Sequence, residues 1–231
     1  MTALGSPRLH LRRVDSTNLR ARELAGAGAP HGTLVTAAEQ TAGRGRQGRA
    51  WSAPANSSLL MSLVLRDPPP LLALRAGLAV ADVAQAVDAT GRAAQVKWPN
   101  DVLVGSGKVA GILVEGRPQE AWAVLGIGLN VALDIDALPG ELRRTAATLG
   151  LAPADIDGVL GHLLEALERR LNDAPATVID ALRTRDALLR RPVSWTGGSG
   201  TGAGIDDEGR LLVDTGNETL ALEAGEVHLG A

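Results

Sequence analysis

The sequence contains no cysteine, phenylalanine or tyrosine among its 231 residues, and it has no long apolar run. The absence of cysteine excludes disulfides, thiolate metal sites and cysteine nucleophiles. The longest uncharged apolar stretch, Ala121 to Leu133, has 13 residues, which is short of the roughly 20 that a membrane-spanning helix needs. The N-terminus lacks an apolar segment of signal-peptide length. We therefore expect no membrane segment and a reducing, cytoplasmic location.

Lysine is also scarce, since Lys97 and Lys108 are the only lysines among 23 basic residues, and the net charge is −3. A domain that binds nucleic acid non-specifically usually has a net positive charge, so we expect no direct nucleic-acid partner. A lysine is a compact ammonium that arginine does not replace. Two lysines within a dozen positions therefore indicate where a functional site could lie.

Apolar residues make up 45% of the chain and charged residues 21%, which is enough apolar content for a sizeable core. Apolar periodicity and turn residues predict helices and strands along the first 190 residues. The helices are expected near 16–27, 71–90, 155–171 and 175–189, and the strands near 33–39, 58–66, 94–98, 102–104, 109–115 and 121–131.

The residue pattern of the sequence changes after Arg191. Residues 192–231 contain short apolar pieces separated by Gly, Asp and Asn, a pattern typical of small all-β units. We therefore predict two domains, residues 1–190 and a small β-barrel at residues 191–231.

The most informative stretch is GRGRQGRAW at positions 43–51. Its three glycines permit close backbone approach to a ligand, its arginines can bind phosphate or carboxylate, and Trp51 offers a face for stacking a base. The stretch matches neither GxxxxGK[ST] nor a GxGxxG that opens a helix. A solvated, flexible loop is the alternative interpretation.

Several other positions have both a functional and a structural interpretation. Lys97 to Asp101 (KWPND) could present an amide and a carboxylate to a nucleotide and its Mg²⁺, or form an ordinary turn between strands. Lys108, at the start of an apolar strand, could meet a ligand anion or extend to solvent. Asn130 could bind a ligand or be a hydrogen-bonded core residue, and the polar residues at 15–18 could cap a helix or bind a polar ring.

The residue spacing supports neither a histidine metal site nor a serine hydrolase. The four histidines are scattered without metal-ligand spacing. No serine carries a local nucleophile signature of a Ser-His-Asp hydrolase.

Five segments, taken together and in order, resemble the motifs of the biotin protein ligases: DSTN at 15–18, EQTAGRGRQGRAWSAP at 39–54, KWPNDV at 97–102, KVAGILVE at 108–115 and GIGLNV at 126–131. The set is specific, whereas any one segment alone is weak. The resemblance implies an α/β (α+β) catalytic domain with a mixed, largely antiparallel sheet, similar to class II aminoacyl-tRNA synthetases. It also implies a C-terminal SH3-like barrel.

The resemblance implies that biotin and MgATP react to biotinyl-5′-AMP, from which one lysine of a biotin carboxyl carrier domain of an acyl-CoA carboxylase takes the biotinyl group. It implies catalytic roles for Lys108, Arg44, Arg46 and Asp101, with Asp101 also the Mg²⁺ ligand. Biotin contacts are implied for Ser16, Thr17, Asn18, Gln40, Gly43, Arg44, Gly45, Arg46, Lys108 and Gly111. ATP contacts are implied for Arg46, Trp51, Lys97, Asn100, Asp101, Lys108 and Asn130.

The same resemblance suggests that residues 43–51 order when biotin binds and shield the mixed anhydride from water. Some members of the family carry a winged-helix domain ahead of DSTN, and the fourteen residues that precede it here are too few for one. We therefore expect a monofunctional ligase. The alternatives are a lipoate or octanoate ligase and a non-catalytic biotin sensor.

Overall fold

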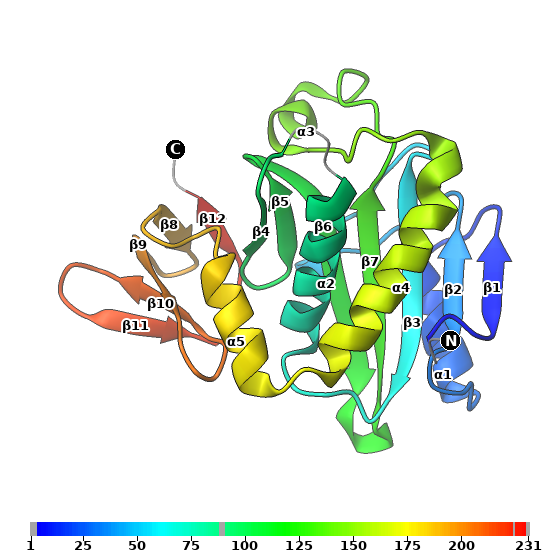
Figure 1. Ribbon diagram of the computed structural model, residues 1–231, viewed down its shortest axis with the longest axis horizontal. Coiled ribbons are helices and arrows are strands. Elements are labelled where there is room, and N and C mark those ends of the chain that lie inside the picture. The colour runs from blue at the N-terminus through cyan, green and yellow to red at the C-terminus, as the bar shows by residue number, and fades with distance from the viewer. Residues whose placement is uncertain (1–3, 88–90, 224, 230–231) are drawn as a thin grey trace.

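The computed structural model describes residues 4–87, 91–223 and 225–229, which form two β-sheets and their covering helices (Figure 1). The larger sheet has seven strands in the order β1-β2-β3-β7-β6-β5-β4. The bounds are β1 Arg8–Leu11, β2 Leu34–Ala37, β3 Ser58–Arg66, β4 Ala94–Lys97, β5 Asp101–Val104, β6 Gly107–Arg117 and β7 Trp122–Asn130. β1 and β2 pair in parallel and the other neighbours run antiparallel. The prediction of a mixed, largely antiparallel sheet is confirmed.

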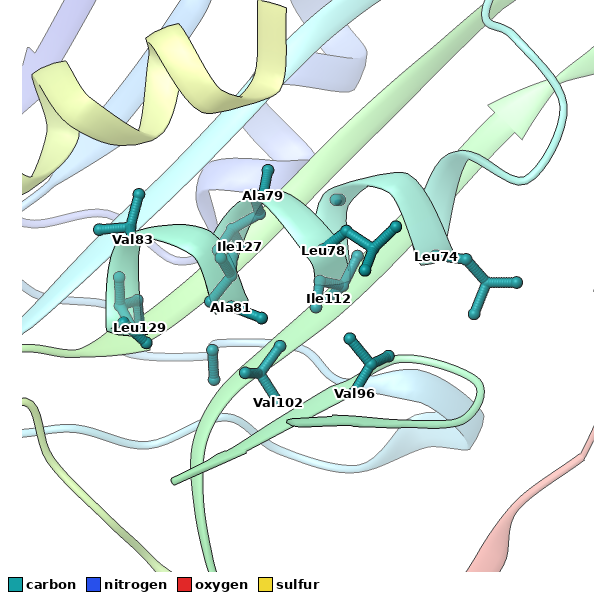
Figure 2. Close-up of a cluster of buried hydrophobic side chains, with 14 of the residues drawn as sticks. Leu74, Leu78, Ala79, Ala81, Val83, Val96, Val102, Ile112, Ile127 and Leu129 are labelled. Carbon is teal, nitrogen blue, oxygen red and sulfur yellow. The ribbon is translucent and has the colours of Figure 1, made fainter. Parts of the chain in front are cut away.

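Helices cover both faces of this sheet, so its central strands are buried. α2 (Leu72–Val87) and α4 (Ile156–Asn172) pack on one face, in front of the sheet in Figure 1, and α1 (Thr17–Gly26) packs on the other. Figure 2 shows side chains of α2, among them Leu78, gathered with Ile112 and Ile127 of the sheet. β3 is buried along almost its whole length, as its continuous apolar run predicts.

Arg75 of α2 joins the two helices on this face. Its side chain is almost fully buried, at 1% exposure. Nε donates to Pro70 O over 2.8 Å, and Nη1 donates to Arg170 O over 2.7 Å and to Asp173 O over 2.8 Å. The last carbonyls of a helix lack intrahelical partners, so this guanidinium satisfies the C-terminal end of α4.

The second sheet follows α5 (Pro175–Thr184) and lies beyond the β4 edge (Figure 1). Its order is β11-β10-β9-β8-β12, antiparallel throughout. The bounds are β8 Pro192–Trp195, β9 Gly198–Ile205, β10 Leu211–Asp214, β11 Thr219–Leu222 and β12 Val227–Leu229.

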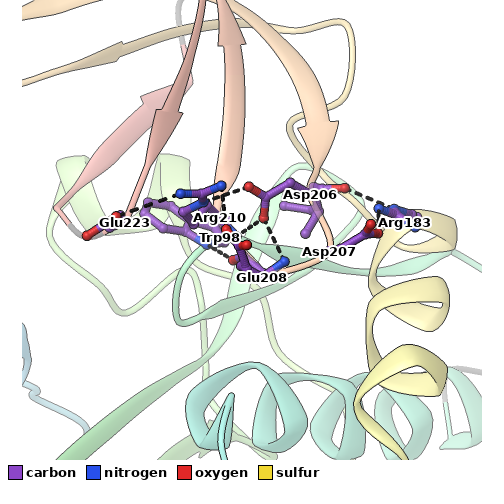
Figure 3. A network of polar contacts seen from close by, with 9 residues as sticks. Trp98, Arg183, Asp206, Asp207, Glu208, Arg210 and Glu223 are labelled. Atoms are coloured by element: carbon purple, nitrogen blue, oxygen red, sulfur yellow. Dashed lines mark hydrogen bonds and ion pairs between the residues drawn. The ribbon is translucent and has the colours of Figure 1, made fainter.

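Polar contacts at the β9–β10 turn attach the second sheet to the rest of the chain (Figure 3). Trp98 Nε1 donates to Gly209 O over 3.0 Å within the protein interior. Arg183 of α5 donates from Nε to Ile205 O over 2.9 Å and from Nη2 to Asp207 Oδ1 over 2.7 Å. The turn after β4 is therefore held directly against the C-terminal sheet.

Trp98→Phe tests this attachment. Phenylalanine fills most of the indole volume but leaves the buried carbonyl of Gly209 without its donor, which costs about 2 kcal/mol of unfolding free energy. Urea unfolding should show a lower midpoint with an unchanged slope. A midpoint equal to that of the wild type would show that the hydrogen bond contributes nothing.

The structure differs from the sequence predictions mainly at short elements. β1 has four residues and α3 (Gly140–Thr145) has six, too few to show a periodicity. The helix predicted to reach residue 189 ends at Thr184, because the chain leaves it to pair with β4: Val96 N donates to Arg185 O over 2.8 Å and Ala187 N donates to Val96 O over 3.0 Å. The helix predicted for 71–90 ends at Val87, and positions 88–90 lie outside the described residues.

Asp186, in this same segment, is a buried carboxyl. Its Oδ1 accepts the N–H of Leu188 over 2.8 Å, while its Oδ2 has no hydrogen-bond partner among the residues that the structure describes. Burial raises the pKa of Asp186, against the opposing effect of the backbone N–H groups of Leu188 and Leu189. A carboxyl whose pKa is higher in the folded than in the unfolded chain destabilises the fold as the pH rises through that interval.

Asp186→Asn should therefore raise the melting temperature at pH 7.5, because asparagine keeps the acceptor for Leu188 and removes the buried charge. The difference from the wild type should shrink as the pH falls toward 4, because the wild-type carboxyl takes up its proton on the way. Thermal melts at both pH values check this, and a difference independent of pH would contradict it.

Among the described residues, no helix is both long and apolar enough to cross a bilayer.

Candidate active site

The N-terminal turn of α1 faces a hollow on the larger sheet, which we call the inner pocket. Its volume is about 440 Å³, including space open to solvent. The pocket is lined by Ser16, Thr17, Asn18, Gln40, Arg44, Gly45, Trp51, Met61, Lys108, Gly111, Ile112, Leu113, Gly126, Ile127 and Gly128. All the residues for which the resemblance implies biotin contacts are present here except Gly43 and Arg46.

Hydrogen bonds between side chains organise the floor of the inner pocket. The backbone N–H and the hydroxyl of Thr17 donate to Gln40 Oε1 over 2.7 and 2.9 Å. Ser62 Oγ lies 2.6 Å from Asn18 Oδ1 and 2.9 Å from Thr17 Oγ1. Ser16 occupies the predicted N-cap position of α1, but its side chain makes no capping hydrogen bond.

Glycines on β6 and β7 give this floor its room. A Cβ on Gly126 would lie 2.0 Å from Asn18 Oδ1, and a Cβ on Gly128 would lie 2.5 Å from the Trp51 ring. A Cβ on Gly111 would lie 3.0 Å from the same ring. Asn18 and Trp51 approach the strands so closely that only glycine, which has no side chain, fits at these positions.

The GRGRQGRAW stretch folds back on itself as a small closed loop. Trp51 N donates to Gly43 O over 2.9 Å, and Gly45 N donates to Arg49 O over 2.8 Å. A Cβ on Gly43 would lie 2.3 Å from Trp51 O, so the base of the loop requires glycine there. Gly43 thus shapes the loop, while Arg44 and Gly45 reach the inner pocket.

Lys108, which lines the inner pocket, pairs with Asp101. Lys108 Nζ lies 2.7 Å from Asp101 Oδ1, and Lys97 Nζ lies 3.9 Å from Asp101 Oδ2. Burial lowers the pKa of Lys97, an effect that the Asp101 carboxylate opposes. Antiparallel pairing sets Lys97 of β4 opposite Asp101, and the register partner of Asp101 on β6 is Gly111, which has no side chain.

A second hollow, the outer pocket, opens on the other side of Lys108. Arg46 Nη1 donates to Asn100 Oδ1 over 3.1 Å at its edge. Arg49 forms an ion pair with Glu226, so the C-terminal segment also reaches this pocket. Its lining is Gly45, Arg46, Gln47, Arg49, Ala50, Trp51, Lys97, Trp98, Pro99, Asn100, Asp101, Lys108, Gly225, Glu226 and Val227.

Trp51 and Lys108 stand at the junction of the two pockets, since both residues line each of them. Lys108 Nζ lies 5.6 Å from the centroid of the Trp51 ring, within cation–π range. A molecule in the inner pocket and one in the outer pocket would therefore meet beside the Lys108 ammonium.

Two of the sequence-predicted residues make their polar contacts away from the Lys108–Asp101 pair. The guanidinium of Arg44 turns to Glu115, with Nη1 3.6 Å from Oε1, whereas Arg46 lies toward Asn100. Asn130 is a buried amide that donates to Ala147 O over 2.9 Å. It borders a third hollow, together with Trp51, Lys108, Leu133, Leu138 and Leu142.

The donor set suits Mg²⁺ only in combination with a ligand. No group of three His, Cys, Asp or Glu side chains among the described residues could hold a metal. Asp101 is the carboxylate that pairs with Lys108 at the junction, and Mg²⁺ in proteins is often held by one or two carboxylates plus substrate phosphates. The residues therefore fit an Mg²⁺ ion that arrives on a triphosphate.

Sequence reasoning missed two residues that complete this site. Ser62 is buried at 0% exposure and is a polar residue within the apolar run of β3, a signal that could have identified it. Glu115 ends the KVAGILVE segment and accepts a hydrogen bond from Asn18 Nδ2 over 2.9 Å. No local pattern predicts that long-range contact.

Residues 10–131 match the model of the biotin/lipoate A/B protein ligase family. The biotin–[acetyl-CoA-carboxylase] ligase of Mycobacterium tuberculosis is 39% identical over 93% of this chain and 85% of that protein. The ligase of the same description from Paracoccus denitrificans is 34% identical, over 95% of this chain and 99% of that one.

A solved structure agrees with these relatives. The biotin protein ligase from Aquifex aeolicus in complex with biotin and ATP superimposes with a TM-score of 0.84 at 27% identity, covering 97% of this chain and 99% of that one. Residues 10–131, which match the family model, contain the 43–51 loop, the junction of the two pockets and the floor of the inner pocket. The chain belongs to the biotin/lipoate A/B protein ligase family, among its biotin protein ligases.

Proposed function

We propose that this chain activates biotin with ATP to biotinyl-5′-AMP and pyrophosphate, and then transfers the biotinyl group to one lysine of a biotin carboxyl carrier domain of an acyl-CoA carboxylase. The observation that carries the proposal is the junction at Lys108 and Trp51, where a polar pocket meets a cationic one. The printed names of the Mycobacterium tuberculosis relative and the Aquifex aeolicus complex support the same substrates.

Biotin would occupy the inner pocket. Its ureido ring needs several hydrogen bonds, and Ser16, Thr17, Asn18 and Gln40 offer hydroxyl and amide groups there. A dithiolane ring or an octanoyl chain would leave such buried polar groups unpaired, at a cost of about 1–3 kcal/mol each. This difference favours biotin over lipoate or octanoate.

ATP would bind across the outer pocket and the third hollow. Arg46, Lys97 and Lys108 would meet the phosphates, with Asn100 holding Arg46 in place. The adenine would lie against Trp51, toward Asn130 and the leucines of the third hollow. Mg²⁺ bound to the phosphates and Asp101 would neutralise part of their charge.

In the first step a biotin carboxylate oxygen attacks the α-phosphorus, and the bond from that phosphorus to the pyrophosphate oxygen breaks. Two anions must approach one another, and a cation 4 Å from a developing charge contributes about 4 kcal/mol of attraction at an effective dielectric constant near 20. Lys108 and Arg46 would supply this attraction. Arg44 would act from the biotin side, where its guanidinium pairs with Glu115.

In the second step the acceptor amine attacks the acyl carbonyl and AMP leaves. The amine has a pKa near 10.4 when free and must lose a proton before it attacks. Asp101 is the carboxylate beside Lys108 and is the group of this chain that we propose for that proton.

Two parts of the chain would contribute to the reaction. Residues 1–190 would form the catalytic domain, similar in fold to class II aminoacyl-tRNA synthetases, and residues 191–231 an SH3-like barrel. The five antiparallel strands of the C-terminal sheet support this proposal. The Arg49–Glu226 contact suggests that the barrel helps the loop to close over ATP. The reaction would take place in the cytoplasm.

Incubation of the purified chain with biotin, MgATP and a biotin carboxyl carrier domain tests the proposal. The expected result is pyrophosphate release followed by a single biotinyl mass gain on one lysine of the carrier. Pyrophosphate release that needs lipoate and ignores biotin would assign the chain to the other branch of the family. Tight biotin binding without AMP formation would make it a sensor.

A further inference from the structure

Glu115 is a carboxylate to which the proposed chemistry assigns no role. It lies on β6 beside the inner pocket, and its side chain is 21% exposed. Oε2 accepts the hydrogen bond from Asn18 Nδ2 over 2.9 Å, and Oε1 accepts one from Arg22 Nη1 over 3.2 Å. Arg44 Nη1 lies 3.6 Å from the same Oε1. One side chain therefore contacts the pocket floor, α1 and the loop.

The chemistry of these partners fixes the orientation of the Asn18 amide. An ionised carboxylate only accepts hydrogen bonds, so the amide nitrogen of Asn18 must face Glu115. Asn18 Oδ1 then faces Ser62 Oγ, 2.6 Å away, and Ser62 must donate its only proton to it. Gly126 leaves just enough room for this amide, since a Cβ there would lie 2.0 Å from Asn18 Oδ1.

An amide nitrogen carries two protons, and the bond to Glu115 uses one. The second proton of Asn18 stays available as a donor for a ligand in the inner pocket that Asn18 lines. Gln40 is oriented in a similar way, because the backbone N–H of Thr17 must face its Oε1. The floor therefore presents amide donors, which suit the carbonyl oxygen of a ureido ring.

We infer that Glu115 is a positioning residue for biotin recognition, which acts by holding the Asn18 amide with its nitrogen as a donor to the ureido carbonyl. This inference rests on the proposed function. The arginine contacts of Glu115 contribute little to it, because Arg22 and Arg44 are 36% and 44% exposed and ion pairs in solvent are weak. Asn18 is 4% exposed, and a buried hydrogen bond to a charged group counts for more.

Glu115→Gln tests the inference with little change of shape. The new side chain has its own amide nitrogen, so it no longer requires the amide nitrogen of Asn18 to face it. We expect the Kd for biotin, measured by calorimetry without ATP, to rise about tenfold, while the KM for ATP stays within about twofold. Glu115→Asp, which keeps the charge but falls one methylene short, should show the same loss.

Glu23→Gln is the matched control. Glu23 is a glutamate on α1 that pairs with Arg20 in solvent and is not among the residues that line the inner or the outer pocket. Its variant should bind biotin like the wild type. A loss equal to that of Glu115→Gln would mean that a nearby charge suffices, and would overturn the inference.

A double-mutant cycle with Asn18→Ala shows whether Glu115 acts through Asn18. Once the amide is removed, Glu115→Gln should cost no further biotin affinity. Losses that add in the double variant, or a Kd unchanged in both Glu115 variants, would overturn the inference and leave the proposed function intact. A wild-type chain that fails to bind biotin would overturn the proposed function itself.

Discussion

Lys108→Ala is expected to slow biotin-dependent pyrophosphate release by about 100-fold or more, the effect of removing one preorganised group that stabilises a transition-state charge. The ammonium stands where the two pockets meet and is held there by Asp101, 2.7 Å away. A biotin carboxylate and an α-phosphate would both lie beside it, so its removal leaves their repulsion uncompensated. Pre-steady-state release of pyrophosphate measures the step directly.

Lys108→Arg serves as the comparison for that variant. Arginine keeps the charge but not the compact ammonium, so activity should return in part. The side chain of Lys108 is 38% exposed, and the alanine variant should melt close to the wild type. A folded alanine variant with nearly wild-type release would remove Lys108 from the chemistry.

Arg46→Ala is expected to shorten the lifetime of enzyme-bound biotinyl-AMP by about 10- to 100-fold. The guanidinium lies on the loop and donates to Asn100 Oδ1 over 3.1 Å, at the edge of the pocket assigned to the phosphates. Loss of a hydrogen bond to a charged group costs about 1.5–3 kcal/mol, which corresponds to that range. Trapping of the released intermediate with a soluble amine measures the leak.

Gln47→Ala is a matched control for the loop, since Gln47 lines the same pocket without carrying charge. The control should leave the lifetime within about threefold of the wild type. An unchanged lifetime in Arg46→Ala would show that the loop does not retain the intermediate through this arginine.

The elements that sequence reasoning predicted best are those with a long periodic signal. The run from Ser58 to Arg66 is a strand with the predicted bounds, because continuous burial on both faces demands an uninterrupted apolar sequence. α2 also forms where its apolar spacing predicts it, and α1 forms between the capping and turn residues that predict it. β1 and α3 are set by pairing and packing with distant segments, which four or six residues do not encode locally.

In the candidate site, too, the local sequence predicts some features and not others. Residue types and their order indicate the loop, the lysines and the polar turn at 15–18. The partner of each side chain depends on strand register and helix placement, so only the structure separates Arg46, beside Asn100, from Arg44, beside Glu115. The sequence does not distinguish a ligand-binding Asn130 from a core Asn130, and in the structure this amide has buried hydrogen bonds and also borders the third hollow.

A crystal structure with biotin and a non-hydrolysable ATP analogue tests the central claim most directly. The account predicts the biotin carboxylate at the junction, with Lys108 Nζ and an Arg46 nitrogen each about 3 Å from a carboxylate or α-phosphate oxygen. Both ligands bound with these two side chains directed away from them would contradict it.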